Sequence, residues 1–123
     1  MIAAVVVTYS APADVLDLCL RALRDEGGLD RIVVVDNGGR ATVSADLRDD
    51  VELVRMANRG YGAAANRGVE ALGDANAIAL LNDDVVVGAG WLGPLEAALE
   101  PPDVGAVQPA LVTPARDTVV SLG

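Results

Sequence analysis

Short apolar runs recur along this chain, and polar or glycine-rich segments separate them. The runs are rich in valine, isoleucine, leucine and alanine, a pattern typical of strands that are covered on both faces. We predict strands at 1–7, 31–35, 51–56 and 77–81, and a further strand at 104–107. Continuous apolar strands of this kind favour a parallel sheet.

Apolar positions with helical spacing lie between the predicted strands. The first helix begins near Pro12, ends at Gly27 and has four residues on its apolar face: Leu16, Cys19, Leu20 and Leu23. A second helix opens at 58–62, and a third covers 91–99. The alternation predicts an α/β fold with a Rossmann-like, mostly parallel sheet and helices on both faces, in three αβα layers. The length of 123 residues predicts one domain.

Polar side chains gather where three of the strands end. The clusters are Thr8, Tyr9 and Ser10; Asp36 and Asn37; and Asn82, Asp83 and Asp84. Ligands of open α/β sheets bind at the carboxyl ends of the strands. The three clusters are therefore predicted to share one binding site.

The acidic turn at 82–84 is a candidate metal site. Side chains alternate along an extended chain, so Asn82 and Asp84 are expected on one side and Asp83 on another. Oxygens at that spacing could hold Mg²⁺ or Mn²⁺, with phosphate oxygens completing the coordination. An ordinary turn or a helix cap explains the same residues and stays open as an alternative.

Two further segments could bind a nucleotide. Asp36 could accept a hydrogen bond from a pyrimidine imide, although Asp-Asn-Gly-Gly is also a strong turn sequence. Gly60 and Gly62 weakly match a dinucleotide fingerprint, with Asp83 at a distance suited to a ribose contact. That fingerprint belongs after the first strand, however, and close packing of a helix on the sheet also calls for small residues.

Composition narrows the possible functions. The net charge is −9, all nine basic residues are arginines, and histidine and lysine are absent. This charge disfavours nucleic-acid binding. Ser-His-Asp catalysis, His-ligated zinc and a Walker-type phosphate loop are excluded. The lone Cys19 is predicted to be a buried structural thiol, and the absence of a charged leader or a long apolar run predicts a cytoplasmic protein.

Several motifs together resemble the family 2 glycosyltransferases, in particular their rhamnosyltransferase-like branch. The matching segments are VVVTYS at 5–10, VVVDNG at 33–38, NRGYG at 58–62, NRG at 66–68 and LLNDD at 80–84. Each motif is modest alone, but they occur in order and with family-like spacing over nearly the whole chain.

The resemblance implies a GT-A fold that binds a nucleoside diphosphate sugar and transfers the sugar, with inversion, to a hydroxyl of a carbohydrate or lipid-linked acceptor. A dTDP- or UDP-sugar is favoured. The residues implied in donor binding are Thr8, Tyr9, Ser10, Asp36, Asn37, Asn58, Gly60, Tyr61, Gly62, Asn66, Asn82 and Asp83, with Asp84 as ligand to Mg²⁺ or Mn²⁺.

Two departures from the family pattern shape the remaining expectations. Asn82 stands where the family's DxD motif has its first carboxylate, and no residue matches the family's catalytic base. We therefore expect a donor-binding half, which is either a piece of a longer protein or a subunit whose acceptor half comes from a second copy or a partner. Two alternatives remain. The first is a non-catalytic nucleotide-binding module, and the weaker one is an NAD(P)-binding oxidoreductase domain.

Overall fold

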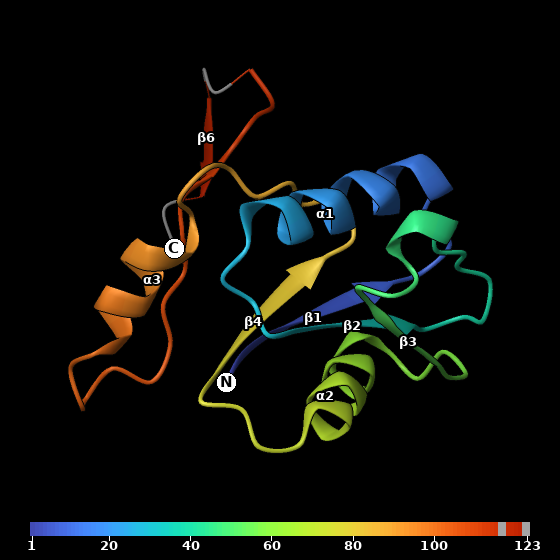
Figure 1. Cartoon of the computed structure of the whole chain (residues 1–123), viewed down its shortest axis with the longest axis horizontal. Helices are drawn as coiled ribbons and strands as arrows, with labels where there is room; N and C mark the ends of the chain where they lie inside the picture. The colour runs from blue at the N-terminus through green and yellow to red at the C-terminus, as the bar shows by residue number, and fades with distance from the viewer. Residues whose placement is uncertain (116–117, 122–123) are drawn as a thin grey trace. The chain divides into compact units, whose positions relative to one another are not determined.

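The computed structural model of the chain describes residues 1–115 and 118–121 (Figure 1). Contacts along the chain define two units, Met1–Gly88 and Ala89–Gly123. The first unit contains β1 (Ile2–Thr8), α1 (Ala13–Glu26), β2 (Arg31–Asp36), the short 3₁₀ helix η1 (Ala45–Leu47), β3 (Glu52–Arg55), α2 (Tyr61–Leu72) and β4 (Ala77–Asn82). The second contains α3 (Leu92–Leu99), β5 (Leu111–Val112) and β6 (Val119–Ser121).

The first unit is built on a four-stranded sheet in the order β3-β2-β1-β4, and every neighbouring pair of strands is parallel. In the register of the sheet, Thr8 lies opposite Asp36, and Val7 lies opposite Asn82. The carboxyl ends of β1, β2 and β4 are therefore level with one another. This alignment brings together the polar clusters that follow these strands, as the sequence predicts.

Both faces of the sheet are covered by helices. Figure 1 shows α1 on one face and α2 on the other. The apolar residues of α1 that the spacing predicts are all buried, as are the β1 residues from Ala3 to Val7. Successive strand residues point to opposite faces, so β1 contributes side chains to both layers of the core. The predicted three-layer α/β fold is confirmed for this unit.

Gly68 sets how closely α2 approaches the sheet. A Cβ atom at this position would lie 2.3 Å from Cγ1 of Val5 and 3.1 Å from Cγ2 of Val35. Both valines belong to the core between α2 and the sheet. The absence of a side chain at Gly68 therefore lets the helix backbone rest directly on two central strands.

We expect Gly68→Ala to destabilise the first unit by about 1–2 kcal/mol. Overpacking a core costs about 1–3 kcal/mol, and the better helix propensity of alanine returns part of it. Urea unfolding followed by circular dichroism measures the loss. Gly62→Ala is the control, because it makes the same substitution in the same helix at a position where a Cβ would meet no atom within 4 Å. Equal stability of the two variants would contradict the packing argument.

The prediction of a strand at 104–107 is wrong. The segment has no regular secondary structure, and Val104 N–H donates to the Pro101 carbonyl (3.0 Å) in a turn that follows α3. The strands of the second unit are instead β5 and β6, which pair antiparallel. The short helix η1 was not expected either, since three residues are too few to show a helical period.

Among the described residues, no helix has both the length and the apolar character needed to cross a membrane.

Candidate functional site

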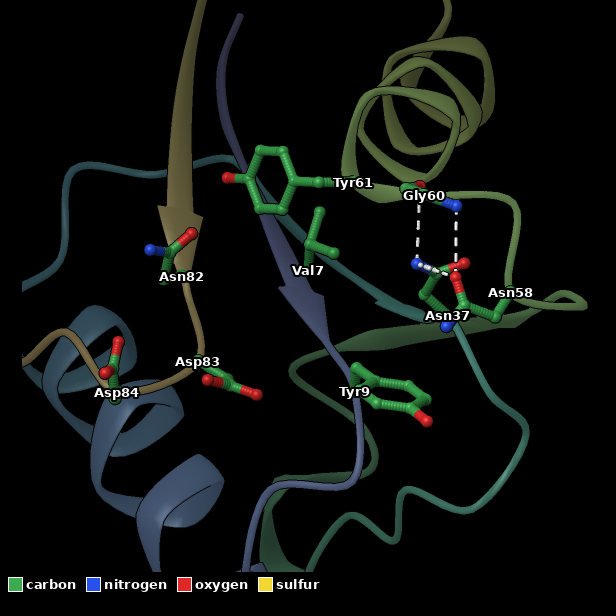
Figure 2. Close-up of a pocket in the computed structure, with 9 residues that line it drawn as sticks. All are labelled: Val7, Tyr9, Asn37, Asn58, Gly60, Tyr61, Asn82, Asp83 and Asp84. Carbon is green, nitrogen blue, oxygen red and sulfur yellow. Dashed lines mark hydrogen bonds between the residues drawn. The ribbon is translucent and has the colours of Figure 1, made fainter.

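A pocket of about 410 Å³ lies at the carboxyl ends of the strands in the first unit (Figure 2). β1 and β4 supply residues to it, and so do the segments that directly follow β1, β2 and β4, the segment before α2, and the first residue of α2. Its lining consists of Val7, Tyr9, Asn37, Asn58, Gly60, Tyr61, Asn82, Asp83 and Asp84. Eight of these nine belong to the set predicted from sequence, and Val7 is the addition. The pocket opens beside β1 and β4, where the strand order reverses direction, which is the usual ligand position in open α/β sheets.

A tight turn presents the acidic residues after β4. Val85 N–H donates to the Asn82 carbonyl (3.3 Å), so Asp83 and Asp84 occupy the two central positions of a four-residue turn. The sequence pattern predicts an extended chain with alternating side chains here, but the chain turns instead. Asn82, Asp83 and Asp84 all line the pocket. Asp84 is exposed, whereas Asp83 is partly buried.

Burial and the charges of the acidic turn together raise the pKa of two neighbouring groups. Burial raises the pKa of the Cys19 thiol to about 12, and the charges of Asp83 and Asp84 add to this shift. Burial, followed by the charge of Asp83, also raises the pKa of Tyr61. Cys19 is buried as predicted, and its thiol lies 3.8 Å from the Asn82 carbonyl, to which it donates. None of the nine lining residues is basic. The pocket is therefore a region of negative potential.

Asn37 fastens the segment before α2 to the end of β2. Its side-chain amide donates to Oδ1 of Asn58 (3.2 Å) and to the Gly60 carbonyl (3.3 Å). Its own oxygen accepts from the Arg59 backbone N–H (3.3 Å), and Asn58 accepts from the Gly60 N–H (3.0 Å). Gly60 adopts a positive φ of 92°, which favours glycine. This network fixes the start of α2 and, with it, the position of Tyr61.

Two tyrosines supply the aromatic surface of the pocket. Tyr9 follows β1, and Tyr61 begins α2; Figure 2 shows their rings in different parts of the pocket. Tyr9 is 61% exposed and Tyr61 is 47% exposed, so both rings are available to a ligand. Gly38 makes room for Tyr9, because a Cβ at Gly38 would lie 2.9 Å from Cδ2 of the ring.

Asp36 is buried and does not belong to the pocket lining. The side chain is 1% exposed and accepts backbone N–H groups from Gly39 (3.0 Å) and Ala41 (2.8 Å). It also accepts from Arg55 of β3 at 2.7 Å, and Arg55 donates in turn to the Ala41 carbonyl. Asp36 thus organises the loop after β2, which is the turn function that the sequence left open. A contact between Asp36 and a base stays a prediction.

The remaining predicted residues do not line the pocket. Thr8 is buried and donates to Asp83. Ser10 is exposed, with a φ of 52° that is uncommon for a residue other than glycine. Gly62 and Asn66 are exposed on α2. In the described part of the chain, no three or more side chains of His, Cys, Asp or Glu converge as a metal-binding group. A cation at the acidic turn would therefore need further oxygens, and their supply by a bound diphosphate stays a prediction.

Comparison with known proteins identifies the family. The model of the family described as glycosyl transferase family 2 matches residues 3–120, which is nearly the whole chain. No curated protein gave a significant match. The family match agrees with the parallel sheet and with a polar pocket at the carboxyl ends of its strands. The chain therefore belongs to glycosyl transferase family 2.

Proposed function

We propose that this chain binds a nucleoside diphosphate sugar together with a divalent cation, as the donor site of an inverting sugar transfer to a hydroxyl acceptor. The supporting observation is the charge of the pocket. Asp83 and Asp84 line it, and none of the nine lining residues carries a positive charge. A diphosphate entering this pocket alone would be repelled, so its binding requires a cation.

The residues at the turn suit such a cation. Carboxylate and amide oxygens are the ligands that Mg²⁺ prefers, and Mg²⁺ usually takes only one or two carboxylates beside phosphate oxygens and water. Asp84 is exposed and, among the described residues, enters no hydrogen bond or ion pair. We assign it as the protein ligand. When bound, the cation would neutralise the diphosphate and stabilise it as it departs from the sugar.

The other walls of the pocket suit the nucleoside and the sugar. The exposed rings of Tyr9 and Tyr61 offer flat surfaces for a base or a sugar ring. Asn58 and Asn82 offer amides that can both donate and accept hydrogen bonds. The segments that resemble the rhamnosyltransferase-like branch support hexosyl or rhamnosyl transfer from a dTDP- or UDP-sugar. A carbohydrate or a lipid-linked sugar is the proposed acceptor.

A thermal-shift screen with UDP, dTDP, GDP and NAD tests the donor site. Each ligand is added once with MnCl₂ and once with EDTA. We expect one nucleoside diphosphate to stabilise the protein in MnCl₂ only. At about one hundred times the dissociation constant, the gain is about 2.7 kcal/mol. Stabilisation by NAD alone, or by a diphosphate equally well in EDTA, would contradict the proposal.

Nucleotide-sugar binding without transfer is the second candidate function. It is supported by the pocket lining, in which the only carboxylates are the two at the acidic turn. If these bind the cation and the donor, neither is free to take a proton from an acceptor hydroxyl. Release of nucleoside diphosphate from a nucleotide sugar, measured with and without an acceptor, distinguishes the two functions.

A further inference from the structure

The hydroxyl of Thr8 links the ends of the two strands that flank the pocket. Thr8 is the last residue of β1 and is 1% exposed. Its Oγ1 donates to Oδ2 of Asp83 at 2.8 Å, across 75 positions of sequence. The register explains this contact, because Val7 lies opposite Asn82. Thr8 follows Val7 in β1, and Asp83 follows Asn82 at the start of the turn after β4.

This bond determines which way the Asp83 carboxylate faces. In the part of the chain that the structure describes, Thr8 is the only side chain that donates to Asp83. Figure 2 shows the Asp83 carboxylate directed toward the end of β1, with the Asp84 carboxylate turned elsewhere. A hydroxyl donates one hydrogen, so Oδ1 of Asp83 is left as an acceptor at the edge of the pocket.

We propose that Thr8 is a positioning residue that acts through Asp83. By holding Oδ2, it keeps Asp83 turned toward β1, where Oδ1 accepts a hydrogen bond from a hydroxyl or N–H group of the bound nucleotide. Asp84 is then the single carboxylate available to the cation. The inference rests on the proposed donor site, because it assigns separate tasks to two adjacent acids of that site.

The two acids would otherwise compete for the cation. They are neighbours in one tight turn, and a divalent cation attracts both carboxylates. Without the Thr8 hydroxyl, Asp83 is free to rotate toward a cation held by Asp84. The nucleotide then loses a hydrogen-bond acceptor, and the cation gains a carboxylate ligand. Loss of the hydroxyl should therefore weaken nucleotide binding without weakening binding of the cation alone.

A double-mutant cycle tests this by calorimetric titration. UDP, dTDP and GDP are each titrated into the wild-type protein in MnCl₂, and the tightest is then used with Thr8→Val, Asp83→Ala and the double variant. Titration with MnCl₂ alone gives the affinity for the cation. Thr8→Val preserves the side-chain shape, Thr8→Ser restores the hydroxyl, and Thr8→Ala replaces Thr8→Val if the latter does not fold.

We expect Thr8→Val to weaken nucleotide binding about tenfold, since a hydrogen bond to a charged group contributes about 1.4 kcal/mol or more. Thr8→Ser should bind the nucleotide nearly as the wild type does. Thr8→Val should not lower the affinity for Mn²⁺, and it should not weaken nucleotide binding further in the Asp83→Ala background. The role proposed for Thr8 is wrong if Thr8→Val weakens nucleotide binding equally in the wild-type and Asp83→Ala backgrounds, or if the affinities for nucleotide and Mn²⁺ fall together. The proposed donor site would stand in either case. Failure of the wild-type protein to bind any of the three diphosphates would overturn the donor site as well.

Discussion

An Asp84→Asn variant should bind nucleoside diphosphate in the presence of Mn²⁺ at least about tenfold more weakly than the wild-type protein, a loss of about 1.4 kcal/mol or more. The substitution keeps the size of the side chain but removes the charge that we assign to the cation. Asn82 already supplies a neutral amide in this turn, so the variant would leave Asp83 as the only charged group in the pocket lining. Hard cations bind charged carboxylates better than amides, and fewer charges lower their affinity.

The measurement is calorimetric titration in MnCl₂ and again in EDTA. We expect the variant and the wild-type protein to differ in MnCl₂ and to bind equally weakly in EDTA. Asp49→Asn is the matched control, because it removes the same charge from an exposed position outside the pocket lining. If the control weakens binding as much as Asp84→Asn does, the effect comes from net charge and the assignment of Asp84 fails.

The second large effect is a loss of folding stability on substitution of Asp36. Asp36→Ala should lower the free energy of unfolding by about 3 kcal/mol, because it removes a buried carboxylate that accepts three hydrogen bonds. The backbone N–H groups of Gly39 and Ala41 would both lose their partner. Urea unfolding followed by circular dichroism measures the loss, and it should exceed that of Gly68→Ala.

Arg55→Ala separates the two contributions to that loss. The Arg55 side chain is 50% exposed, so its ion pair with Asp36 is partly screened by water, and we expect a loss of about 1 kcal/mol or less. The backbone bonds to Asp36 remain in this variant. If Arg55→Ala and Asp36→Ala destabilise the protein equally, the ion pair rather than the loop contacts accounts for the stability that Asp36 provides.

The strands and helices of the first unit could be predicted closely because their signals are local. The strand predicted at 31–35 is observed as Arg31–Asp36, and the helix that Gly27 was predicted to stop ends at Glu26, with Gly27 as its C-cap. A long apolar run or a repeated helical spacing contains enough residues to outweigh chance. The segment 104–107 is short and contains glycine, and a turn uses the Val104 N–H. The local pattern of apolar residues cannot show whether such a segment forms a strand or a turn.

Most of the pocket lining could be predicted from the sequence, but the contacts of the buried residues Thr8 and Asp36 could not. Strand ends can be located in sequence, and parallel register brings their polar residues together. The partners of Asp36 and Thr8 could not be located in this way. Asp36 depends on Arg55 of a different strand, and Thr8 depends on Asp83, 75 positions away. The family resemblance implies donor binding for both residues, and the structure adds a partner within the protein for each.

The pairing of β1 with β4 also governs when the site can form during synthesis. β1 is made before the other three strands of its sheet, yet its second neighbour in the sheet is β4, the last of them. At about 5–20 residues per second, a ribosome needs roughly 4 to 15 seconds to extend the chain from Thr8 to Asp83. Throughout that interval one edge of β1, whose residues 2–7 are all apolar, lacks its partner. During this time the exposed edge of β1 in the nascent chain can pair wrongly or bind a chaperone. The pairing of β4 with β1 then completes the sheet and forms the pocket in one step.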